Sequence, residues 1–535
     1  MLYFIPAWYQ ANHWRENEQH WYIRRMRTEF DDTVKQIQLF HRNGAHPYQI
    51  VLLSHAPNFR HFLHRQGIYH APYWSCFDSI QCIRRKKIRM FSFRNIRWPE
   101  HTEFAYSPFA TLAYVDGVKY AQIEFGEDGN PIQIDMYHAD WIIRRNLYDD
   151  RGFVSSTTIY ERGKPVYCDY LTQEGKWNIR EFIGDGHIEV NPQVGAFLLT
   201  IDGEEKMQKF RKQRYATMGE VILEVLTAYI EHTDSEDIFC SAMHDLHWRV
   251  LDQALQGRKR VVTFFENRFP WEKLPDMKEY LEKSNYIITD SQRITRQILE
   301  RTGELQTRIR DITPYDTRRD YGISQQLSVQ KILVPVDGMD DRFFYEITKE
   351  LAQYVEKNDK AMIHYFTRNN DYDQKNKIIT KAQEVLRLEG YDIRLAGEET
   401  DRQVSENRID EEEEEEIKVR FFVEQCVDEL TTSKCLREQR VIVDLRDKLS
   451  LYLQISGISM GIPQIVRYET QYVQHEKNGY VLQELEQLQE VLDYYLQELN
   501  HWNHAMVAAF EIGENYTTAK LVEQWKEVID IIGKD

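Results

Sequence analysis

The 535-residue chain has few of the features that mark membrane, secreted or metal-binding proteins. Its six cysteines form no C-x-x-C pair and have no neighbouring histidine ligands, so the sequence predicts reduced, mostly buried thiols and no metal site. No apolar run approaches the roughly 18 residues that span a bilayer. The N-terminus lacks the basic, apolar and small-residue order of a signal peptide. We therefore expect a cytoplasmic protein.

Positive charge is also scarce, with 68 Lys and Arg residues against 86 Asp and Glu, a formal net charge of −18. Nucleic-acid binding depends on neutralising phosphates with Lys and Arg, so this balance argues against a nucleic-acid partner. A composition of 42% hydrophobic and 29% charged residues is typical of a folded protein. At about 100–200 residues per domain, the length suggests roughly three domains.

The order of strand and helix patterns predicts an α/β protein whose first domain is interrupted. The opening strand "YFIPAW" is followed by the helical "FDDTVKQIQLFHRNG", which ends at a glycine, and then by a continuous apolar strand. This order is typical of a parallel sheet covered by helices. The pattern stops near residue 89 and resumes later. We predict that residues 1–88 and 217–321 form one discontinuous N-terminal Rossmann-like domain.

The intervening residues 89–216 have a different pattern, with recurrent turns and period-2 runs such as "VSSTTIYE". Regular turns between alternating runs predict an antiparallel meander, here an inserted β-sheet domain. The turn signals are Asp116-Gly117, Asp128-Gly129, Arg151-Gly152, Arg162-Gly163, Glu174-Gly175 and Asp185-Gly186.

A second series of alternating strands and helices predicts a C-terminal Rossmann-like domain over residues 322–500. Residues 501–535 follow as helices that we expect to pack back on the N-terminal half. Within this series the acid-rich block 399–416, which ends in six consecutive glutamates, is typical of a solvated loop.

The paired halves and the run "MGIPQIVRYETQYVQHEKNGYVLQELEQL" resemble the retaining GT-B glycosyltransferases. That resemblance implies two glutamates on the helix before Gly-Ile-Pro to hold the sugar donor. It also implies basic residues after the first strand of the second half to hold the donor diphosphate. The matching positions here are Lys448 and Ser456 for the glutamates, and Asp337, with Asp341 nearby, for the basic residues.

These departures predict a degenerate donor site, a catalytically inactive fold and no cofactor. The stretch "LSLYLQISGISMGIPQIV" over residues 449–466 contains no charged residue at all. An acid at a diphosphate site opposes the ligand by about 1 kcal/mol or more per close like-charge pair. The stretch is interpreted as a donor-site scaffold kept for packing.

A closer resemblance covers nearly the whole chain. The segments "LYFIPAWYQ", "LYDDRGFVSSTTIYERGKPVYCDYLTQEGKW" and "DITPYDTRRDYGISQQL" are similar to the first accessory secretory protein family of the accessory Sec system. The resemblance implies a non-catalytic, GT-B-like subunit that assembles with the second and third accessory secretory proteins. It also implies work with the accessory SecA motor and translocon in exporting serine-rich repeat glycoproteins.

The sequence leaves two other functions open. "DDRGFVSS" and "GKPVYCDYL" are shared with the glycosyltransferases that start O-GlcNAc addition to these adhesins, so an active GT-B enzyme acting on Ser or Thr is the main alternative. A carbohydrate-binding module is the other. His55, and His244 with Asp245 and His247, follow apolar strands, where a His-Asp pair would serve as a general base. Structural histidines explain these residues equally well.

Two groups of residues are candidates for binding a partner or substrate. Seven basic residues within 15 positions favour an anionic membrane surface or an acidic partner, with a charged strand edge as the alternative. Four aromatic residues of the predicted sheet suit contact with sugars or polypeptide, with a place in the core as the alternative. The sheet edges would suit strand addition. The basic residues are Arg84, Arg85, Lys86, Lys87, Arg89, Arg94 and Arg97, and the aromatic residues are Tyr160, Tyr167, Tyr170 and Trp177.

Overall fold

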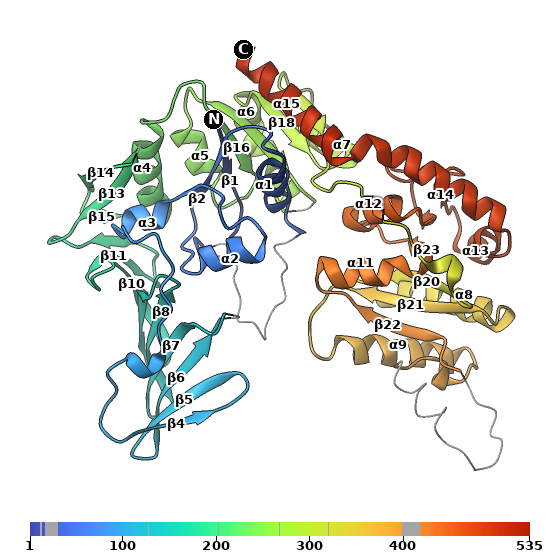
Figure 1. The fold of residues 1–535 in the computed structure, drawn as a ribbon, viewed down its shortest axis with the longest axis horizontal. Coiled ribbons are helices and arrows are strands. Elements are labelled where there is room, and N and C mark those ends of the chain that lie inside the picture. The colour runs from blue at the N-terminus through green and yellow to red at the C-terminus, as the bar shows by residue number, and fades with distance from the viewer. Residues whose placement is uncertain are drawn as a thin grey trace.

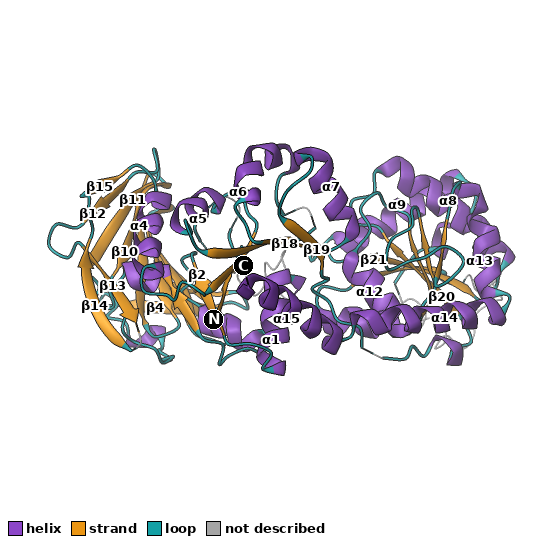
Figure 2. Ribbon diagram, turned by 90° about the horizontal axis from the view of Figure 1, so that it is seen from above, coloured by secondary structure: helices purple, strands orange, loops and turns teal. Residues whose placement is uncertain are grey.

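The computed structural model describes the chain except residues 11–12, 16–29, 127, 202, 267, 319, 399–417 and 535. The acid-rich block expected to be a solvated loop therefore lies outside the described residues. Figure 2 shows three parts in a row: an antiparallel sheet, a parallel sheet covered by helices, and a second such sheet.

The central part is built on a seven-stranded parallel sheet of order β19-β18-β17-β16-β1-β2-β3. Strand β1 pairs with β2 on one side and with β16 on the other, although β16 follows β1 by more than 200 residues. Chain segments before and after the antiparallel sheet therefore form one sheet. The strands are β1 (Leu2–Ile5), β2 (Tyr48–Leu52), β3 (Tyr73–Ser75), β16 (Ile238–Ala242), β17 (Lys259–Phe264), β18 (Tyr286–Thr289) and β19 (Arg308–Asp311).

Helices cover both faces of this sheet (Figure 1). Asp31 caps the first helix by accepting the backbone N–H groups of Thr33 and Val34, and Gly44 ends it with φ 55°. Trp525 of the last helix meets the rings of Phe4 and Phe40, so the C-terminal end packs on the N-terminal sheet. The helices are α1 (Asp32–Asn43), α2 (Phe59–Arg65), α3 (Cys76–Ile80), α4 (Met218–Ile230), α5 (Trp248–Ala254), α6 (Lys278–Glu282), α7 (Gln292–Thr302) and α15 (Thr518–Lys534).

The antiparallel part is a ten-stranded sheet of order β15-β12-β11-β10-β9-β8-β7-β6-β5-β4, with β13 and β14 as a separate pair. The six glycines of the predicted turns all have φ between 75° and 83°, a region that residues with a Cβ rarely adopt. The strands are β4 (Thr102–Tyr106), β5 (Ala110–Val115), β6 (Val118–Phe125), β7 (Pro131–His138), β8 (Trp141–Asp149), β9 (Phe153–Glu161), β10 (Lys164–Leu171), β11 (Trp177–Phe182), β12 (Ile188–Val190), β13 (Ala196–Ile201), β14 (Glu204–Lys209) and β15 (Arg214–Tyr215).

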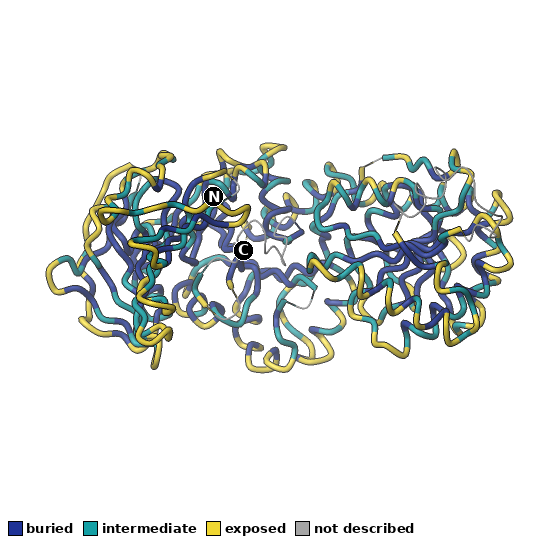
Figure 3. Tube along the Cα trace, turned by 90° about the horizontal axis from the view of Figure 1, so that it is seen from below, coloured by how far each residue is buried: buried dark blue, intermediate teal, exposed yellow. Residues whose placement is uncertain are grey.

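The third part is a six-stranded parallel sheet of order β22-β21-β20-β23-β24-β25, and Figure 3 shows its strands as the buried centre of this end of the molecule. Helices α8, α9 and α13 share a core with one face, and α11 and α12 with the other. The strands are β20 (Gln330–Pro335), β21 (Ala361–Thr367), β22 (Phe421–Gln425), β23 (Gln439–Asp444), β24 (Gln464–Val466) and β25 (Gly479–Val481), and the helices are α8 (Asp341–Lys357), α9 (Gln374–Leu388), α11 (Glu429–Arg437), α12 (Leu451–Met460), α13 (Leu488–Leu496) and α14 (Leu499–Gly513).

Short 3-10 helices complete the described structure, and none of the described helices is long and apolar enough to cross a membrane. These short segments are η2 (Phe93–Asn95), η3 (Trp271–Met277), η4 (Ser324–Gln326), η5 (Ile393–Leu395), η6 (Leu485–Gln487) and η7 (Glu514–Tyr516).

Candidate functional site

The uncharged stretch forms helix α12, its C-terminal turn and strand β24. Ser450 caps the helix by accepting the N–H of Leu453, and Gly461 ends it with φ 69°. A Cβ on Gly461 would lie 2.6 Å from Met506 Cγ of α14, so this glycine also permits α14 to approach closely. One side of α12 therefore packs on the sheet and another side packs on α14.

A third side of α12 meets the N-terminal half. The ring of Tyr452 lies edge-on to Phe30, with centroids 4.8 Å apart, and edge-on to Tyr315 at 5.2 Å. The hydroxyl of Tyr315 donates to the carbonyl of Phe30 at 2.5 Å, which holds these two residues of the N-terminal half together against Tyr452. A charged side chain enclosed on these three sides would lose its hydration without a partner. Burial accounts for the absence of charge in this stretch.

A cavity of about 800 Å³ opens at the ends of β20 and β21. The resemblance to GT-B enzymes implies that the diphosphate of a sugar donor would bind after β20. The charged lining of the cavity consists of Asp337, Asp373, Lys377 and Lys381, two acids and two bases. The cavity therefore does not have the excess of negative charge that the sequence suggested.

Each of the three acids after β20 has a local partner. The carboxylate of Asp337 accepts the hydroxyl of Thr367 at 2.5 Å and the backbone N–H of Arg368 at 2.7 Å, which joins the ends of β20 and β21. Asp340 caps α8. Asp341 is largely exposed and pairs with Lys381 at 2.5 Å. Lys381 offsets the charge of Asp341 toward a diphosphate, and the place of Asp341 in a degenerate donor site stays a prediction.

Lys448 and Ser456 lie beyond β23, the neighbour of β20 in the sheet, but neither lines this cavity. Lys448 is exposed in the loop before α12, and Ser456 is partly exposed on the helix itself. Arg446, which pairs with Asp444 at 2.7 Å, donates to the carbonyl of Asp337 at 3.0 Å. This arginine links the loop before α12 to the end of β20.

The candidate general base at "HDLH" does not form in the structure. Asp245 pairs with Lys273 at 2.5 Å rather than with a histidine. His247 is fully buried, with its Nδ1 2.9 Å from the hydroxyl of Tyr9. Burial lowers the pKa of His244 to about 4. The contact between His247 and Tyr9 joins the chain after β16 to the chain after β1.

His55 also has a structural role. Its Nε2 lies 2.8 Å from the hydroxyl of Ser155 on β9, and burial lowers its pKa to about 3, so the ring is neutral at physiological pH. The amide of Gln81 donates to the carbonyls of Ser155 and Leu171 at 2.7 and 2.8 Å. Together they attach the antiparallel sheet to the central part.

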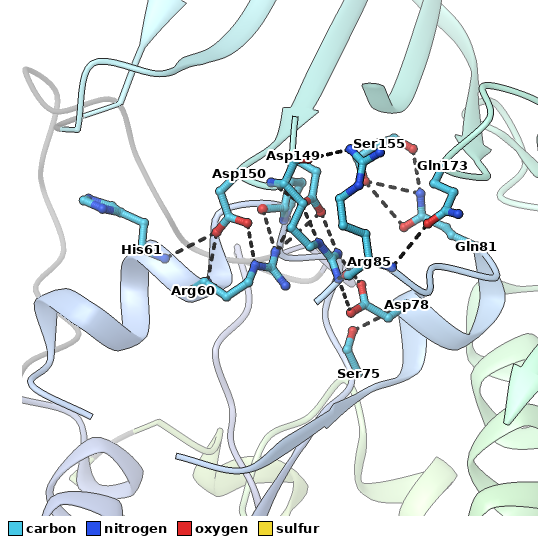
Figure 4. A network of polar contacts seen from close by, with 12 residues as sticks. Arg60, His61, Ser75, Asp78, Gln81, Arg85, Asp149, Asp150, Ser155 and Gln173 are labelled. Atoms are coloured by element: carbon cyan, nitrogen blue, oxygen red, sulfur yellow. Dashed lines mark hydrogen bonds and ion pairs between the residues drawn. The ribbon is translucent and has the colours of Figure 1, made fainter. Parts of the chain in front are cut away.

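A buried network of charges also attaches these two parts to each other, and Figure 4 shows it. Arg60 of α2 contacts Asp150 through its Nε and lies 3.4 Å from Asp149. Arg151 pairs with Asp149 and with Asp78 of α3, both at 2.7 Å. The end of β8 and the turn after it thus supply three consecutive residues, Asp149, Asp150 and Arg151. These residues form ion pairs with α2 and α3 of the central part. The sequence showed this triplet only as a motif.

The electrostatics of this network follow from burial and pairing. Burial acts to raise the pKa of Asp149, but the guanidinium groups of Arg60 and Arg151 outweigh it and hold that pKa below its ordinary value. Asp150 has one arginine partner, and burial raises its pKa to about 6. Asp149 is thus held as a carboxylate.

The seven basic residues lie in the connection between α3 and β4, not on a strand edge. Three of them have partners within the protein. Arg84 pairs with Glu205 at 2.7 Å, and Arg85 donates to the carbonyl of Arg151 at 2.8 Å. Arg94 donates to the hydroxyl of Tyr106 at 2.7 Å. All except the half-buried Arg85 are exposed, namely Arg84, Lys86, Lys87, Arg89, Arg94 and Arg97.

The four aromatic candidates do not act as one group. The guanidinium of Arg180 lies 3.9 Å from the ring centre of Tyr167 and 4.9 Å from that of Trp177, so these two half-buried rings share one cation. Tyr160 lies beside a different arginine. Tyr170 is 1% exposed and packs on His55, so it is excluded as a substrate contact.

Two parallel-sheet halves that meet across an aromatic contact, with the last helix crossing back to the first half, define a GT-B glycosyltransferase-like protein. A solved structure of this class, the pneumococcal O-GlcNAc transferase GtfA in complex with UDP and GlcNAc, aligns with a TM-score of 0.70 at 10% identity, covering 100% of this chain and 99% of that one.

The chain belongs to the family of accessory Sec system protein 1, whose model matches residues 1–531. The family member of Streptococcus gordonii is 33% identical over 99% of this chain and 100% of its own length. The crystal structure of accessory secretory protein 1, 2 and 3 in Streptococcus pneumoniae aligns over the full length of both chains, with a TM-score of 0.79 and 28% identity. The predicted resemblance and fold class are confirmed.

Proposed function

We propose that this chain is a non-enzymatic subunit of the accessory Sec export system that assembles with the second and third accessory secretory proteins. Family membership supports a place in the system, and the similar pneumococcal protein was crystallised with the other two. In this account the complex delivers a glycosylated serine-rich repeat adhesin to the accessory SecA motor and translocon, from the cytoplasmic side of the membrane.

The observation that carries the non-enzymatic role is the environment of α12. The helix that would hold the donor carries Ser456 in place of a carboxylate, and the exposed loop before it carries Lys448 in place of the other. Tyr452 fills the contact between the halves against Phe30 and Tyr315. Together these features leave α12 as a helix that packs the two halves together and carries no carboxylate to hold a sugar donor.

The antiparallel sheet is the proposed contact for the adhesin. Strand β4 lies at the end of the ten-stranded sheet, and three of its five residues are exposed, which suits addition of an extended Ser-rich strand. Tyr167 and Trp177 offer half-buried rings beside Arg180 on the same sheet. Tyr160, whose ring lies beside Arg145, is a further proposed contact for the adhesin.

The connection between α3 and β4 is the proposed contact with anionic lipid or an acidic partner. Its exposed cations would each contribute about 1 kcal/mol near an anionic leaflet. Because the whole chain carries −18, only a local patch of this kind favours such a surface. The attraction should weaken with salt, since exposed charges are screened beyond about 8 Å at physiological ionic strength.

A second candidate function is transfer of a sugar to Ser or Thr of the adhesin. The cavity of about 800 Å³ at the ends of β20 and β21, with two lysines in its lining, favours it. The likeness to the pneumococcal O-GlcNAc transferase shows the fold alone. Binding and turnover of UDP-GlcNAc distinguish the two functions.

The assembly role is tested by isolating the tagged chain from its own host and identifying the chains that copurify. We expect the second and third accessory secretory proteins in a fixed ratio that survives gel filtration. Isolation of the chain alone from cells that make all three proteins would contradict the assembly role.

The lipid contact is tested by flotation with anionic and neutral liposomes at low and high salt. A variant with Lys86, Lys87, Arg89 and Arg97 changed to Ser should lose the salt-sensitive binding to anionic liposomes. The matched control changes four exposed cations of the central part to Ser, namely Lys278, Lys283, Arg296 and Arg308. Equal flotation of wild type and the loop variant would contradict the lipid contact.

A further inference from the structure

Three side chains with metal-binding atoms converge at one edge of the C-terminal sheet. Glu424 lies near the end of β22, Cys426 follows that strand, and Cys435 lies on α11. One carboxylate oxygen and the two Sγ atoms all lie within 4.8 Å of one another. The two cysteines are nine positions apart, a spacing outside the usual zinc signatures, so this group is not evident from the sequence.

Local structure holds the three side chains in place without a metal ion. The backbone N–H of Cys426 donates to the carbonyl of Thr367 at 2.9 Å, which fixes the chain leaving β22 beside β21. Asp428 then starts α11 with a capping box that includes Thr431. The helix therefore returns over the strand end and brings Cys435 back to Cys426.

The surroundings of Glu424 favour a bound ion. His364 of β21 places its Nδ1 2.9 Å from a carboxylate oxygen of Glu424, which orients the carboxylate. Nearby Lys331 has its charge balanced by Glu438 at 2.5 Å. A cavity of about 200 Å³ opens beside Glu424, and its lining also includes His364, Lys331 and Lys375. A polar group that orients a ligand is a regular feature of metal sites in proteins.

We propose that Glu424, Cys426 and Cys435 bind a thiophilic divalent cation of the Zn²⁺ class. Two thiolates select such an ion over Mg²⁺ and Ca²⁺, which prefer oxygen ligands. Binding releases the two thiol protons to solvent, and the ion takes the two sulfurs and the carboxylate, with water completing a tetrahedral set. His364 acts as a positioning residue for Glu424.

The site has a structural consequence for the contact between the two halves. The ion would join the edge strand β22 to α11, and Glu429 at the start of α11 contacts Lys35 of α1 in the N-terminal half. Loading the site should therefore stabilise α11 and, through it, this contact. The inference is independent of the proposed export role.

The test uses the full chain, purified in reductant and stripped with a chelator. Titration with Co²⁺ should give one equivalent bound, with a thiolate-to-cobalt charge-transfer band in the near ultraviolet that Zn²⁺ abolishes. Changing Cys435 to Ser should weaken Zn²⁺ binding by more than about tenfold, and changing His364 to Gln by about tenfold. The same change at Cys240, a buried cysteine of the central sheet, is the matched control and should leave binding unchanged.

Thermal unfolding gives a second readout. Zn²⁺ should raise the midpoint of the wild type and of Cys240→Ser, but not of Cys435→Ser. Glu424→Gln, which keeps the side-chain volume, guards against a cysteine variant that fails to fold, and it should also lose affinity. Absence of the charge-transfer band in the reduced wild type, or binding that survives both Cys435→Ser and Glu424→Gln, would overturn the proposal.

Discussion

Changing Arg60 to Met should weaken the attachment of the antiparallel sheet to the central part. The side chains of Arg60, Asp149 and Asp150 are 5%, 2% and 1% exposed, so the variant leaves a buried carboxylate without its cation. Removing one partner of a buried pair costs about 3–5 kcal/mol. Asp150 keeps the backbone N–H groups of Arg60 and His61, and Asp149 keeps Arg151, so we expect the lower end, about 3 kcal/mol.

The assay for this variant is hydrogen exchange, because a chain with several cores does not unfold in one step. A loss of about 3 kcal/mol corresponds to roughly 100-fold faster exchange in β8 and β9. Arg394→Met removes an exposed pair with Asp392 and should leave these strands unchanged. Since burial already raises the pKa of Asp150 to about 6, the loss should shrink at pH 5, where its carboxyl is protonated. Exchange in β8 and β9 that is the same in Arg60→Met and in the wild type at pH 7.5 would refute this role of Arg60.

Three further predictions concern the C-terminal half and its contact with the central part. Gly461→Ala should lower the unfolding midpoint, with a loss of stability of about 1–3 kcal/mol. Gly461 has a φ of 69°, and an added Cβ would lie too close to Met506. An unchanged midpoint would contradict this prediction. Burial raises the pKa of Asp290 to about 7 from an ordinary 3.8, so the folded state binds the extra proton between these values and loses stability as pH rises through them. Asp290→Asn should remove that loss, by up to about 4 kcal/mol at pH 7.5, and denaturant unfolding at pH 4.5 and 7.5 checks whether the difference between variant and wild type grows with pH. Restoring glutamates at Lys448 and Ser456 together should yield no sugar transfer in a UDP-release assay, and turnover would show that the missing carboxylates alone silence the site.

Local features of the fold were predictable because they depend on neighbouring residues. Asp31 and Gly44 mark the ends of α1 in the sequence, and both act as caps in the structure. The turn glycines marked the hairpins of the antiparallel sheet for the same reason. The parallel-sheet class followed from continuous apolar strands between helices, a pattern that requires burial on both faces.

Contacts between distant residues were not predictable in the same way. The pair between Asp341 and Lys381 is an example, because nothing in the sequence places Lys381, forty positions on, beside Asp341. Alternation puts Tyr167 and Tyr170, three positions apart, on opposite faces of β10, but it does not say which face His55 and Phe77 cover. Arg60 and Asp150 are 90 positions apart, and only the folded chain joins them.

Calorimetry with UDP-GlcNAc on the purified full chain tests the non-enzymatic role most directly. The predicted result is no saturable heat at millimolar nucleotide sugar and no release of UDP with a Ser-rich acceptor peptide, under conditions in which an active O-GlcNAc transferase gives both. Binding in the micromolar range together with UDP release and modified peptide would contradict the account and establish the chain as an enzyme.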